Sequence, residues 1–287
     1  MLKENARAKI NLTLDITGTR ADGYHEVAMI LQTIELADEV ELKKISGGIN
    51  LKMDAAEIIG GESIPTDEKN LAWKAAVEFQ KFFGKNFPVA ISLKKKIPAA
   101  AGLAGGSADA AAVIRGMNRL YELNLTEDEL CKIGERVGSD VPFCIIGGTC
   151  LAKGRGEILT RLAPIKNFGV VLAKPQGEIS TAWAYKTYDE NPAKTHPPTE
   201  KIIVQLENKN YDAAFKNFSN VLENVALKKI STVADCKSKM LAAGAKVALM
   251  SGSGPTVFAL TDDDLTLKKI VASVENLNTQ IFITKIF

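Results

Sequence analysis

A run of small residues between a predicted strand and a predicted helix constrains the fold of this chain most strongly. It reads P-A-A-A-G-L-A-G-G-S-A-D, from Pro98 to Asp109. Gly102, Gly105 and Gly106 lack Cβ, so the backbone can adopt positive φ and bring its N–H groups close to a ligand. A helix that begins here adds unpaired N–H groups and the positive end of its dipole. The run favours a phosphate-binding turn, and a ligand-free tight turn is the alternative.

The same run excludes two common nucleotide motifs. Neither G-x-x-x-x-G-K-[ST] nor G-x-G-x-x-G occurs in the chain, so it has no Walker loop and no dinucleotide fingerprint. Ser107 can cap the helix or turn its hydroxyl to a phosphate or to magnesium. The candidate phosphate-binding residues are Pro98, Ala99, Ala100, Ala101, Gly102, Leu103, Ala104, Gly105, Gly106, Ser107 and Ala108.

Strands and helices are mixed along the chain without strict alternation. Apolar residues alternate with polar ones at 8–16, which predicts a half-buried strand, and Asp22-Gly23 is a turn signal. Thr126 and Glu129 have the spacing of a capping box at the start of a helix. These patterns predict an α+β fold with two lobes and a boundary at 159–166. The other expected strands are 39–42, 87–93, 141–152, 169–173, 256–260 and 281–285, after a mostly apolar stretch at 28–36, and the main expected helices are 70–83, 107–121 and 126–138.

Charge and composition narrow the function class. The chain has 36 basic and 34 acidic residues, a net charge of +2, which argues against a nucleic-acid or membrane-surface protein. Two histidines and four cysteines without a C-x-x-C pair give no metal site and indicate buried, reduced thiols. No apolar run approaches the ~20 residues that span a bilayer. With no signal-peptide pattern at the start, we expect a cytoplasmic protein.

Two further segments can supply chemistry. G-S-D-V-P-F at 138–143 places the Asp140 carboxylate between a helix end and a strand entered through proline; a turn aspartate bonded to its own backbone is the alternative. S-G-S-G-P-T at 251–256 is a second flexible loop, or a plain turn. A carboxylate, a lysine on the first strand and a glycine loop suit phosphoryl transfer. Lys9 and Asp140 are 131 positions apart, however, and no motif proves that they meet.

Together these segments resemble three ordered motifs of the GHMP kinase superfamily: the first strand, the loop and helix at 98–112, and 251–260. Within that superfamily the chain looks like the 4-diphosphocytidyl-2-C-methyl-D-erythritol kinase family. The motifs that carry this likeness are A-K-I-N-L-T-L at 8–14, D-G-Y-H at 22–25, G-S-D-V-P-F at 138–143 and G-R-G-E at 154–157. The resemblance implies an S5-like N-terminal ATP-binding lobe, residues 1–160, and a ferredoxin-like C-terminal lobe, residues 161–287.

The resemblance also implies an activity. The family uses ATP, and by implication Mg²⁺, to phosphorylate the 2-hydroxyl of 4-diphosphocytidyl-2-C-methyl-D-erythritol, on the non-mevalonate route to isoprenoid precursors. Lys9 and Asp140 match the family's catalytic pair. Asp140 would take or orient the hydroxyl proton, and Lys9 would keep Asp140 ionised and polarise the hydroxyl.

The binding residues are implied in the same way. Asn11 would help to hold the substrate, and Tyr24 and His25 match positions that flank the cytosine. Tyr185, in I-S-T-A-W-A-Y at 179–185, would stack on the base, with a plain core residue as the alternative. Asn70 and Leu71 resemble a segment on the adenine side.

The chain departs from the family pattern at its phosphate loop. Many members have a glycine-richer loop and a Ser-Ser pair, where this chain has Ala101, Ala104 and Ser107-Ala108. Two other functions are considered. One is another kinase of the superfamily, acting on homoserine or mevalonate, against which D-G-Y-H and S-D-V-P-F argue. The other is a non-catalytic nucleotide-sensing module, against which the retained Lys9 and Asp140 argue.

Overall fold

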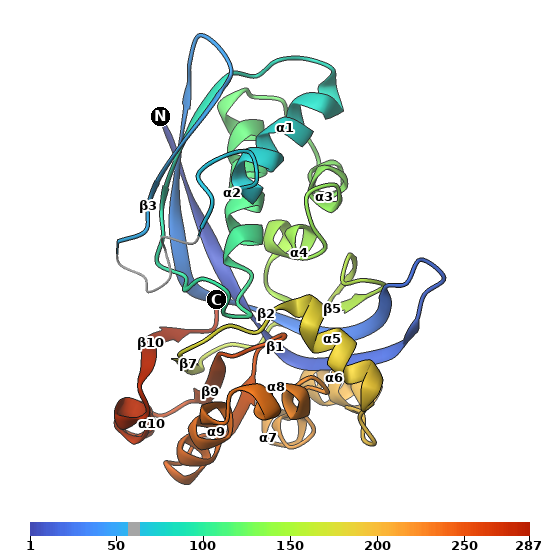
Figure 1. Ribbon diagram of the computed structural model, residues 1–287, viewed down its shortest axis with the longest axis vertical. Coiled ribbons are helices and arrows are strands. Elements are labelled where there is room, and N and C mark those ends of the chain that lie inside the picture. Colours follow the sequence, from blue (N-terminus) through green and yellow to red (C-terminus); the bar gives the residue numbers. More distant parts are fainter. Residues whose placement is uncertain (57–63) are drawn as a thin grey trace. The chain divides into compact units, whose positions relative to one another are not determined.

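The computed structural model describes residues 1–56 and 64–287, and the chain divides into two compact units (Figure 1). Unit 1 comprises Met1–Lys9, Leu36–Ala99 and Ala104–Gly147. Unit 2 comprises Ile10–Glu35, Ala100–Leu103 and Gly148–Phe287. Over the described residues the fold is α+β, as expected, and its strands form two sheets.

The two units interleave along the chain because two long strands take part in both. These are β1 (Leu2–Thr19) and β2 (His25–Lys44), which pair with each other. A single boundary at residue 160 therefore does not describe the compact units, and 1–160 and 161–287 remain a prediction of where the ATP-binding and C-terminal domains divide. The apolar stretch at 28–36 and the alternating stretch at 39–42 are parts of the one strand β2.

Unit 1 places four helices beside its strands. In it β4 (Val89–Lys94) pairs with β3 (Ile49–Asp54) in parallel and with 39–44 of β2 in antiparallel fashion. The helices α1 to α4 contact one another and gather beside these strands (Figure 1). Their bounds are α1 Leu71–Phe83, α2 Gly105–Leu120, α3 Glu127–Glu135 and α4 Val141–Ile146.

Unit 2 contains the ferredoxin-like lobe. Its antiparallel sheet has the order β10-β7-β9-β8, and the chain passes through it as β7, α9, β8, β9, α10, β10, the split βαβ pattern. The helices α9 and α10 pack on this sheet. The bounds are β7 Gly169–Pro175, α9 Thr232–Ala242, β8 Val247–Met250, β9 Val257–Thr261, α10 Asp264–Val274 and β10 Thr279–Lys285.

Of the remaining elements of unit 2, β5 and β6 precede this lobe in the chain, and α5 to α8 are inserted between β7 and α9. β5 pairs with 29–32 of β2 and with β6. A short 3-10 turn, Glu275–Leu277, precedes β10. The other bounds are β5 Thr149–Lys153, β6 Ile158–Arg161, α5 Thr181–Glu190, α6 Thr199–Glu207, α7 Tyr211–Phe215 and α8 Glu223–Lys229.

One predicted strand is wrong. Residues 141–146 form helix α4, and the strand begins only at Thr149. The segment is rich in Val, Phe and Ile, which favour strands, but Pro142 lies in the first helical turn, where its fixed φ and missing N–H are tolerated. Asp140 therefore lies between two helices. The helix expected to end near Gly138 ends at Glu135, while its capping box of Thr126 and Glu129 is confirmed.

Neither a membrane-spanning helix nor a disulfide occurs among the described residues. In residues 1–56 and 64–287, no helix has both the length and the apolar character needed to cross a membrane. The four cysteine thiols form no disulfide among the residues described.

Candidate active site

Lys9 and Asp140 meet in unit 1. Lys9 Nζ lies 4.0 Å from Asp140 Oδ2, and the lysine side chain is 6% exposed while the carboxylate is 34% exposed. Lys9 lies on β1, and Asp140 lies in the short connection between α3 and α4. A buried cation thus lies against a carboxylate that solvent or a ligand can still reach, an arrangement suited to accepting a proton from a bound hydroxyl.

In the part of the chain that the structure describes, the Asp140 carboxylate makes no capping hydrogen bond to α4, the helix that it precedes. Within the described residues 140–146, its side chain does not cap α4, so the alternative of a turn aspartate bonded to its own backbone does not apply. Asp140 contributes its backbone carbonyl instead, which accepts from Cys144 N–H at 3.1 Å. Burial, followed by the nearby Asp140 charge, raises the pKa of the Cys144 thiol to about 12, so this cysteine stays protonated beside the pair.

The predicted phosphate site lies at the first turn of α2. The residue before it, Ala104, takes the N-cap position with φ 58° and has no side-chain oxygen with which to cap the helix. Ala100 also has positive φ, at 47°, a conformation that costs about 1–3 kcal/mol outside glycine. Gly106, in the first turn, is exposed. Strained alanines ahead of an uncapped helix start are what a phosphate-binding loop would show.

A buried network of three charged side chains lies next to this turn. Lys95 Nζ forms ion pairs with Asp38 and Asp109, and all three side chains are at most 3% exposed. Asp38 also accepts from the backbone N–H groups of Lys96 and Ile97, at 2.5 and 2.8 Å, just before the loop begins. Lys95 Nζ lies 3.7 Å from the point where a Cβ on Gly105 would stand. The network therefore joins β2 and the end of β4 to the first turns of α2.

Burial governs the titration of this network. It raises the pKa of Asp109 to about 8, against the opposing effect of Lys95 and with a further increase from the Asp38 charge. Burial alone would lower the pKa of Lys95, but the Asp109 and Asp38 carboxylates outweigh it and raise that pKa. Among the described residues, Asp109 Oδ1 has no hydrogen-bond partner. A proton on Asp109 near neutral pH would leave the triad without net charge.

Asn70 and Leu71 have different positions relative to the loop. Asn70 is the N-cap of α1: its Oδ1 accepts from Ala72 N–H at 2.9 Å and its Nδ2 donates to the Pro65 carbonyl at 2.7 Å. The side chain is buried, so its polar atoms are occupied by structural bonds. Leu71 Cδ1 lies 3.3 Å from where a Gly106 Cβ would stand, which puts its apolar side chain beside the phosphate turn.

In unit 2, the second glycine loop packs directly on the first. Ser251 Oγ donates to the Gly102 carbonyl at 2.9 Å, and it accepts from Asn11 N–H at 3.2 Å. A Cβ on Gly102, whose φ is +73°, would stand 2.2 Å from the Ser251 carbonyl oxygen. Only glycine fits there, so the loop at 251–255 is more than a plain turn and helps to shape 100–103.

The loop at 251–255 is also tied to the rest of unit 2. Asn220 Nδ2 donates to the carbonyls of Met250 and Gly252, both at 2.8 Å. Thr181, at the start of α5, lies 3.3 Å from Ser253 through their hydroxyls. Asn11 is fully buried, and its Nδ2 donates to Met29 Sδ at 3.3 Å. Asn11 thus has a role in holding the loop, and its predicted contact with substrate stays a prediction.

The predicted base-binding residues of unit 2 come together in part. His25 and Tyr185, 160 positions apart, have ring centroids 4.8 Å apart and planes inclined by 40°. Tyr185 is half-buried on α5, whose buried positions are Ala184 and Tyr188, so it is not plain core. Asp189, one turn further along α5, lies 2.7 Å from His25 Nε2 through its Oδ1. That contact fastens α5 to the start of β2.

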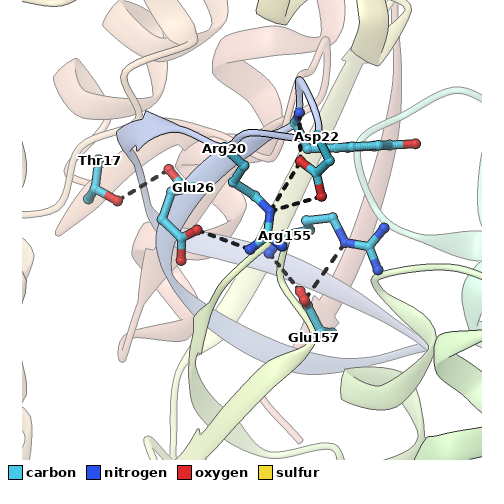
Figure 2. Close-up of polar contacts among 7 residues, drawn as sticks. Thr17, Arg20, Asp22, Glu26, Arg155 and Glu157 are labelled. Atoms are coloured by element: carbon cyan, nitrogen blue, oxygen red, sulfur yellow. Dashed lines mark hydrogen bonds and ion pairs between the residues drawn. The ribbon is translucent and has the colours of Figure 1, made fainter.

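Tyr24 lies at the tip of the β1–β2 hairpin, and its side chain is 58% exposed. Arg20 pairs with Asp22 and Glu26 around this tip, as Figure 2 shows, and the Asp22-Gly23 turn is confirmed by the Gly23 N–H bond to the Arg20 carbonyl. The Tyr24 N–H donates to Asp22 at 3.1 Å; this bond, and then Arg20, lower the pKa of Asp22.

Sequence reasoning missed several of these residues. No motif in the sequence points to Asp38, Lys95, Asp189 or Asn220. Lys95 lies in a run of three lysines, which does not show that it is buried. A polar residue within apolar sequence is the only other signal, and it does not show which residue the polar side chain contacts.

Comparison with known proteins defines the class of this chain. The model for the N-terminal domain of GHMP kinases matches residues 70–148, and the model for their C-terminal domain matches residues 202–279. Together with the α+β fold and the uncapped phosphate turn, these matches define a GHMP kinase.

Curated relatives define the family within that class. A 4-diphosphocytidyl-2-C-methyl-D-erythritol kinase of Acetivibrio thermocellus is 44% identical over 98% of this chain and 97% of its own length. One from Bacillus pumilus is 45% identical over 97% of this chain and 94% of its own length. The chain belongs to the 4-diphosphocytidyl-2-C-methyl-D-erythritol kinase family, and it is an enzyme that uses ATP as the phosphate donor. These full-length relatives do not favour a homoserine kinase, a mevalonate kinase or a non-catalytic module.

Solved structures agree with the fold. A crystal structure of 4-(cytidine 5'-diphospho)-2C-methyl-D-erythritol kinase has a TM-score of 0.81 and 28% identity, covering 99% of this chain and 98% of that one. A homoserine kinase from Cytophaga hutchinsonii has a TM-score of 0.77 at 19% identity, covering 99% of this chain and 94% of that one, which is a likeness of fold alone.

Proposed function

We propose that this kinase transfers the γ-phosphoryl group of ATP to the 2-hydroxyl of 4-diphosphocytidyl-2-C-methyl-D-erythritol, a step toward isoprenoid precursors. The observation that carries the proposal is the contact between Lys9 and Asp140, since a buried lysine 4.0 Å from a reachable carboxylate is what hydroxyl activation needs. The names of the full-length relatives support the choice of acceptor.

Phosphoryl transfer forms one bond to the γ-phosphorus and breaks another. The acceptor oxygen forms a bond to the γ-phosphorus, the bond from that phosphorus to the bridging oxygen of ADP breaks, and ADP leaves. The hydroxyl proton passes to Asp140. Lys9 stabilises the Asp140 carboxylate and polarises the hydroxyl, and the first turn of α2 binds phosphate oxygens through its N–H groups.

A magnesium ion fits the donor set of this chain if it arrives with the nucleotide. Across the residues described, no group of three or more His, Cys, Asp or Glu side chains could hold a metal ion. Mg²⁺ in kinases is typically bound by one or two protein groups together with substrate phosphates and water. Ser107, half-buried in the first turn of α2, offers its hydroxyl as one such group. The ion would neutralise charge on the transferred phosphoryl group.

Recognition of the acceptor rests on aromatic side chains of unit 2. His25 and Tyr185 lie with their rings 4.8 Å apart, and Tyr24 precedes His25 on the hairpin. A cytosine has a π face that stacks on such rings, each stacking contact being worth about 1–3 kcal/mol. These three residues would bind the cytosine, a part of the acceptor that is remote from the reacting hydroxyl. The energy of that binding would help to position the hydroxyl. As part of the same proposal the enzyme acts in the cytoplasm, where ATP is made available, and cell fractionation checks that location.

An acceptor panel at fixed ATP and Mg²⁺ tests the proposal. The panel contains 4-diphosphocytidyl-2-C-methyl-D-erythritol, the methylerythritol phosphate that lacks the cytidylyl group, homoserine and mevalonate. We expect efficient ADP release with the first compound, a much lower kcat/KM with the second, and none with the others. Efficient turnover of homoserine or mevalonate would overturn the acceptor and leave the kinase assignment standing.

A further inference from the structure

An exposed tyrosine at the hairpin tip is held by an arginine that has no role in the reaction described so far. The Arg155 guanidinium lies 5.3 Å from the centroid of the Tyr24 ring, a cation–π distance. Tyr24 is 58% exposed, although its neighbour His25 is nearly buried, at 13%. A large exposed aromatic ring held by a cation is more ordered than a surface tyrosine would otherwise be.

The turn that carries Arg155 is itself fixed. Glu157 accepts from the Arg155 backbone N–H at 2.6 Å, and its carboxylate lies 3.7 Å from Arg155 Nε (Figure 2). Gly154 and Gly156 have φ of +71° and +114°, and a Cβ on Gly154 would stand 2.9 Å from the Glu157 carboxylate. The Gly154 carbonyl accepts from Val27 N–H at 2.9 Å, which attaches the turn to β2.

The hairpin on the other side of the ring is equally constrained. Arg20 bonds Asp22 at 3.2 Å and Glu26 at 3.2 Å, and Thr17 donates to the Glu26 carbonyl at 3.2 Å (Figure 2). Asp22 also faces the positive charge of Arg155. Two small, internally bonded turns thus bring a tyrosine and a guanidinium together.

We propose that Arg155 is a positioning residue for acceptor binding, whose guanidinium orders the Tyr24 ring so that the ring receives the nucleobase of the acceptor. The inference rests on the proposed function, in which Tyr24 contacts a cytosine. Ordering the ring before binding removes the entropy loss that binding would otherwise bear. Arg155 then affects the affinity for any ligand that stacks on Tyr24, and neither the chemical step nor ATP binding.

A double-mutant cycle on binding tests this role. Cytidine diphosphate is titrated calorimetrically into the parent and into Arg155→Gln, Tyr24→Leu and the double variant, and acceptor KM and kcat are measured for each. We expect Arg155→Gln to weaken cytidine diphosphate about three- to tenfold and to raise acceptor KM by the same factor. The kcat and the KM for ATP stay unchanged, and Arg155→Lys, which keeps the cation, recovers most of the affinity.

Non-additivity is the decisive readout. If Arg155 acts through the ring, the double variant binds no more weakly than Tyr24→Leu. Arg119→Gln is the matched control, because Arg119 forms a comparable surface ion pair, 2.6 Å from Glu4, and should leave every constant unchanged. Parent-like binding by Arg155→Gln, or a loss that adds fully to that of Tyr24→Leu, overturns the proposal. Failure to turn over the acceptor while cytidine diphosphate still binds would contradict the proposed function and not this inference.

Discussion

The phosphate turn of unit 1 and the hairpin tip of unit 2 are held in place in opposite ways. The turn rests on Asp38, Lys95 and Asp109, which are almost fully buried. The hairpin tip is organised by Arg20, Asp22 and Glu26, whose side chains are 34–47% exposed.

The difference suits the ligand that the proposed function gives to each region. Triphosphate recognition depends on fixed backbone N–H groups, so rigidity from a buried network is useful. Recognition of a base depends on ring faces that must stay reachable, so the ordering groups lie at the surface. Changes in unit 1 should therefore alter chemistry, ATP binding or stability, and changes at the hairpin should alter only acceptor binding.

Asp140→Asn should have the largest effect, and that effect should fall on the chemical step and not on acceptor binding. The amide keeps the shape but cannot take the proton, so we expect kcat to fall ~10²-fold or more with little change in acceptor affinity. Lys9→Ala should cause a similar loss, and the two losses should not add, because the residues act as a unit. Steady-state kinetics on the three variants check this; a parent-like kcat for Asp140→Asn would contradict the assignment.

Gly106→Val tests the phosphate turn next. A Cβ here meets only the flexible end of Leu71, at 3.3 Å, so the fold should persist, while the added methyl groups cover backbone N–H donors. Losing one or two charge-assisted bonds should weaken ATP about 10- to 100-fold. Nucleotide titration and circular dichroism measure the two properties.

Gly102→Ala serves as the contrasting variant, because its Cβ would stand 2.2 Å from the Ser251 carbonyl oxygen. It should lose thermal stability, where Gly106→Val does not. Unchanged ATP affinity in folded Gly106→Val would mean that the turn binds no phosphate.

Tyr185→Ala tests the proposed base recognition in unit 2. Loss of base stacking should weaken acceptor binding by ~1–3 kcal/mol and leave ATP affinity unchanged. Inhibition by cytidine diphosphate, measured on parent and variant, reads this directly. Equal inhibition of both would show that the base is held elsewhere.

Asp109→Asn should have the smallest effect, on stability alone. The pKa of Asp109 is raised in the folded state, to about 8 from 3.8, so the folded protein holds a proton that the unfolded chain releases. Stability from this group is fully present below the unfolded pKa of 3.8 and is lost as pH rises toward 8. Between pH 6 and 7, the stability of Asp109→Asn should fall less steeply than that of the parent. Parallel denaturation curves would refute a protonated Asp109.

Local signals in the sequence predicted local structure well. The Asp22-Gly23 turn and the Thr126–Glu129 capping box describe bonds between near neighbours, and each is confirmed. The strand at 8–16 is also confirmed, but all of its residues are buried, so the half-buried strand that its alternation predicted is wrong. Of the strand expected at 141–152, only the part from Thr149 is confirmed. Residues 141–146 are helical because apolar β-branched and aromatic residues also suit a short buried helix, and tertiary packing decided between the two.

The site was predictable only through a likeness to known kinases. Lys9 with Asp140 and His25 with Tyr185 are brought together by the fold, and no local pattern predicts such pairs. Lys95 illustrates the remaining gap: the lysine run looks like a solvated face, yet the middle lysine is buried between two carboxylates. The Asn70 side chain caps α1, and its predicted contact with nucleotide stays a prediction.

The most direct test is to identify where the phosphate goes. Purified enzyme, ATP, Mg²⁺ and 4-diphosphocytidyl-2-C-methyl-D-erythritol are incubated together, and the product is characterised by phosphorus and carbon NMR while ADP is counted. We predict one new phosphomonoester on the 2-hydroxyl for each ADP formed, and almost none with Asp140→Asn. ADP released without modification of the acceptor, or a phosphate on another oxygen, would contradict the proposed reaction.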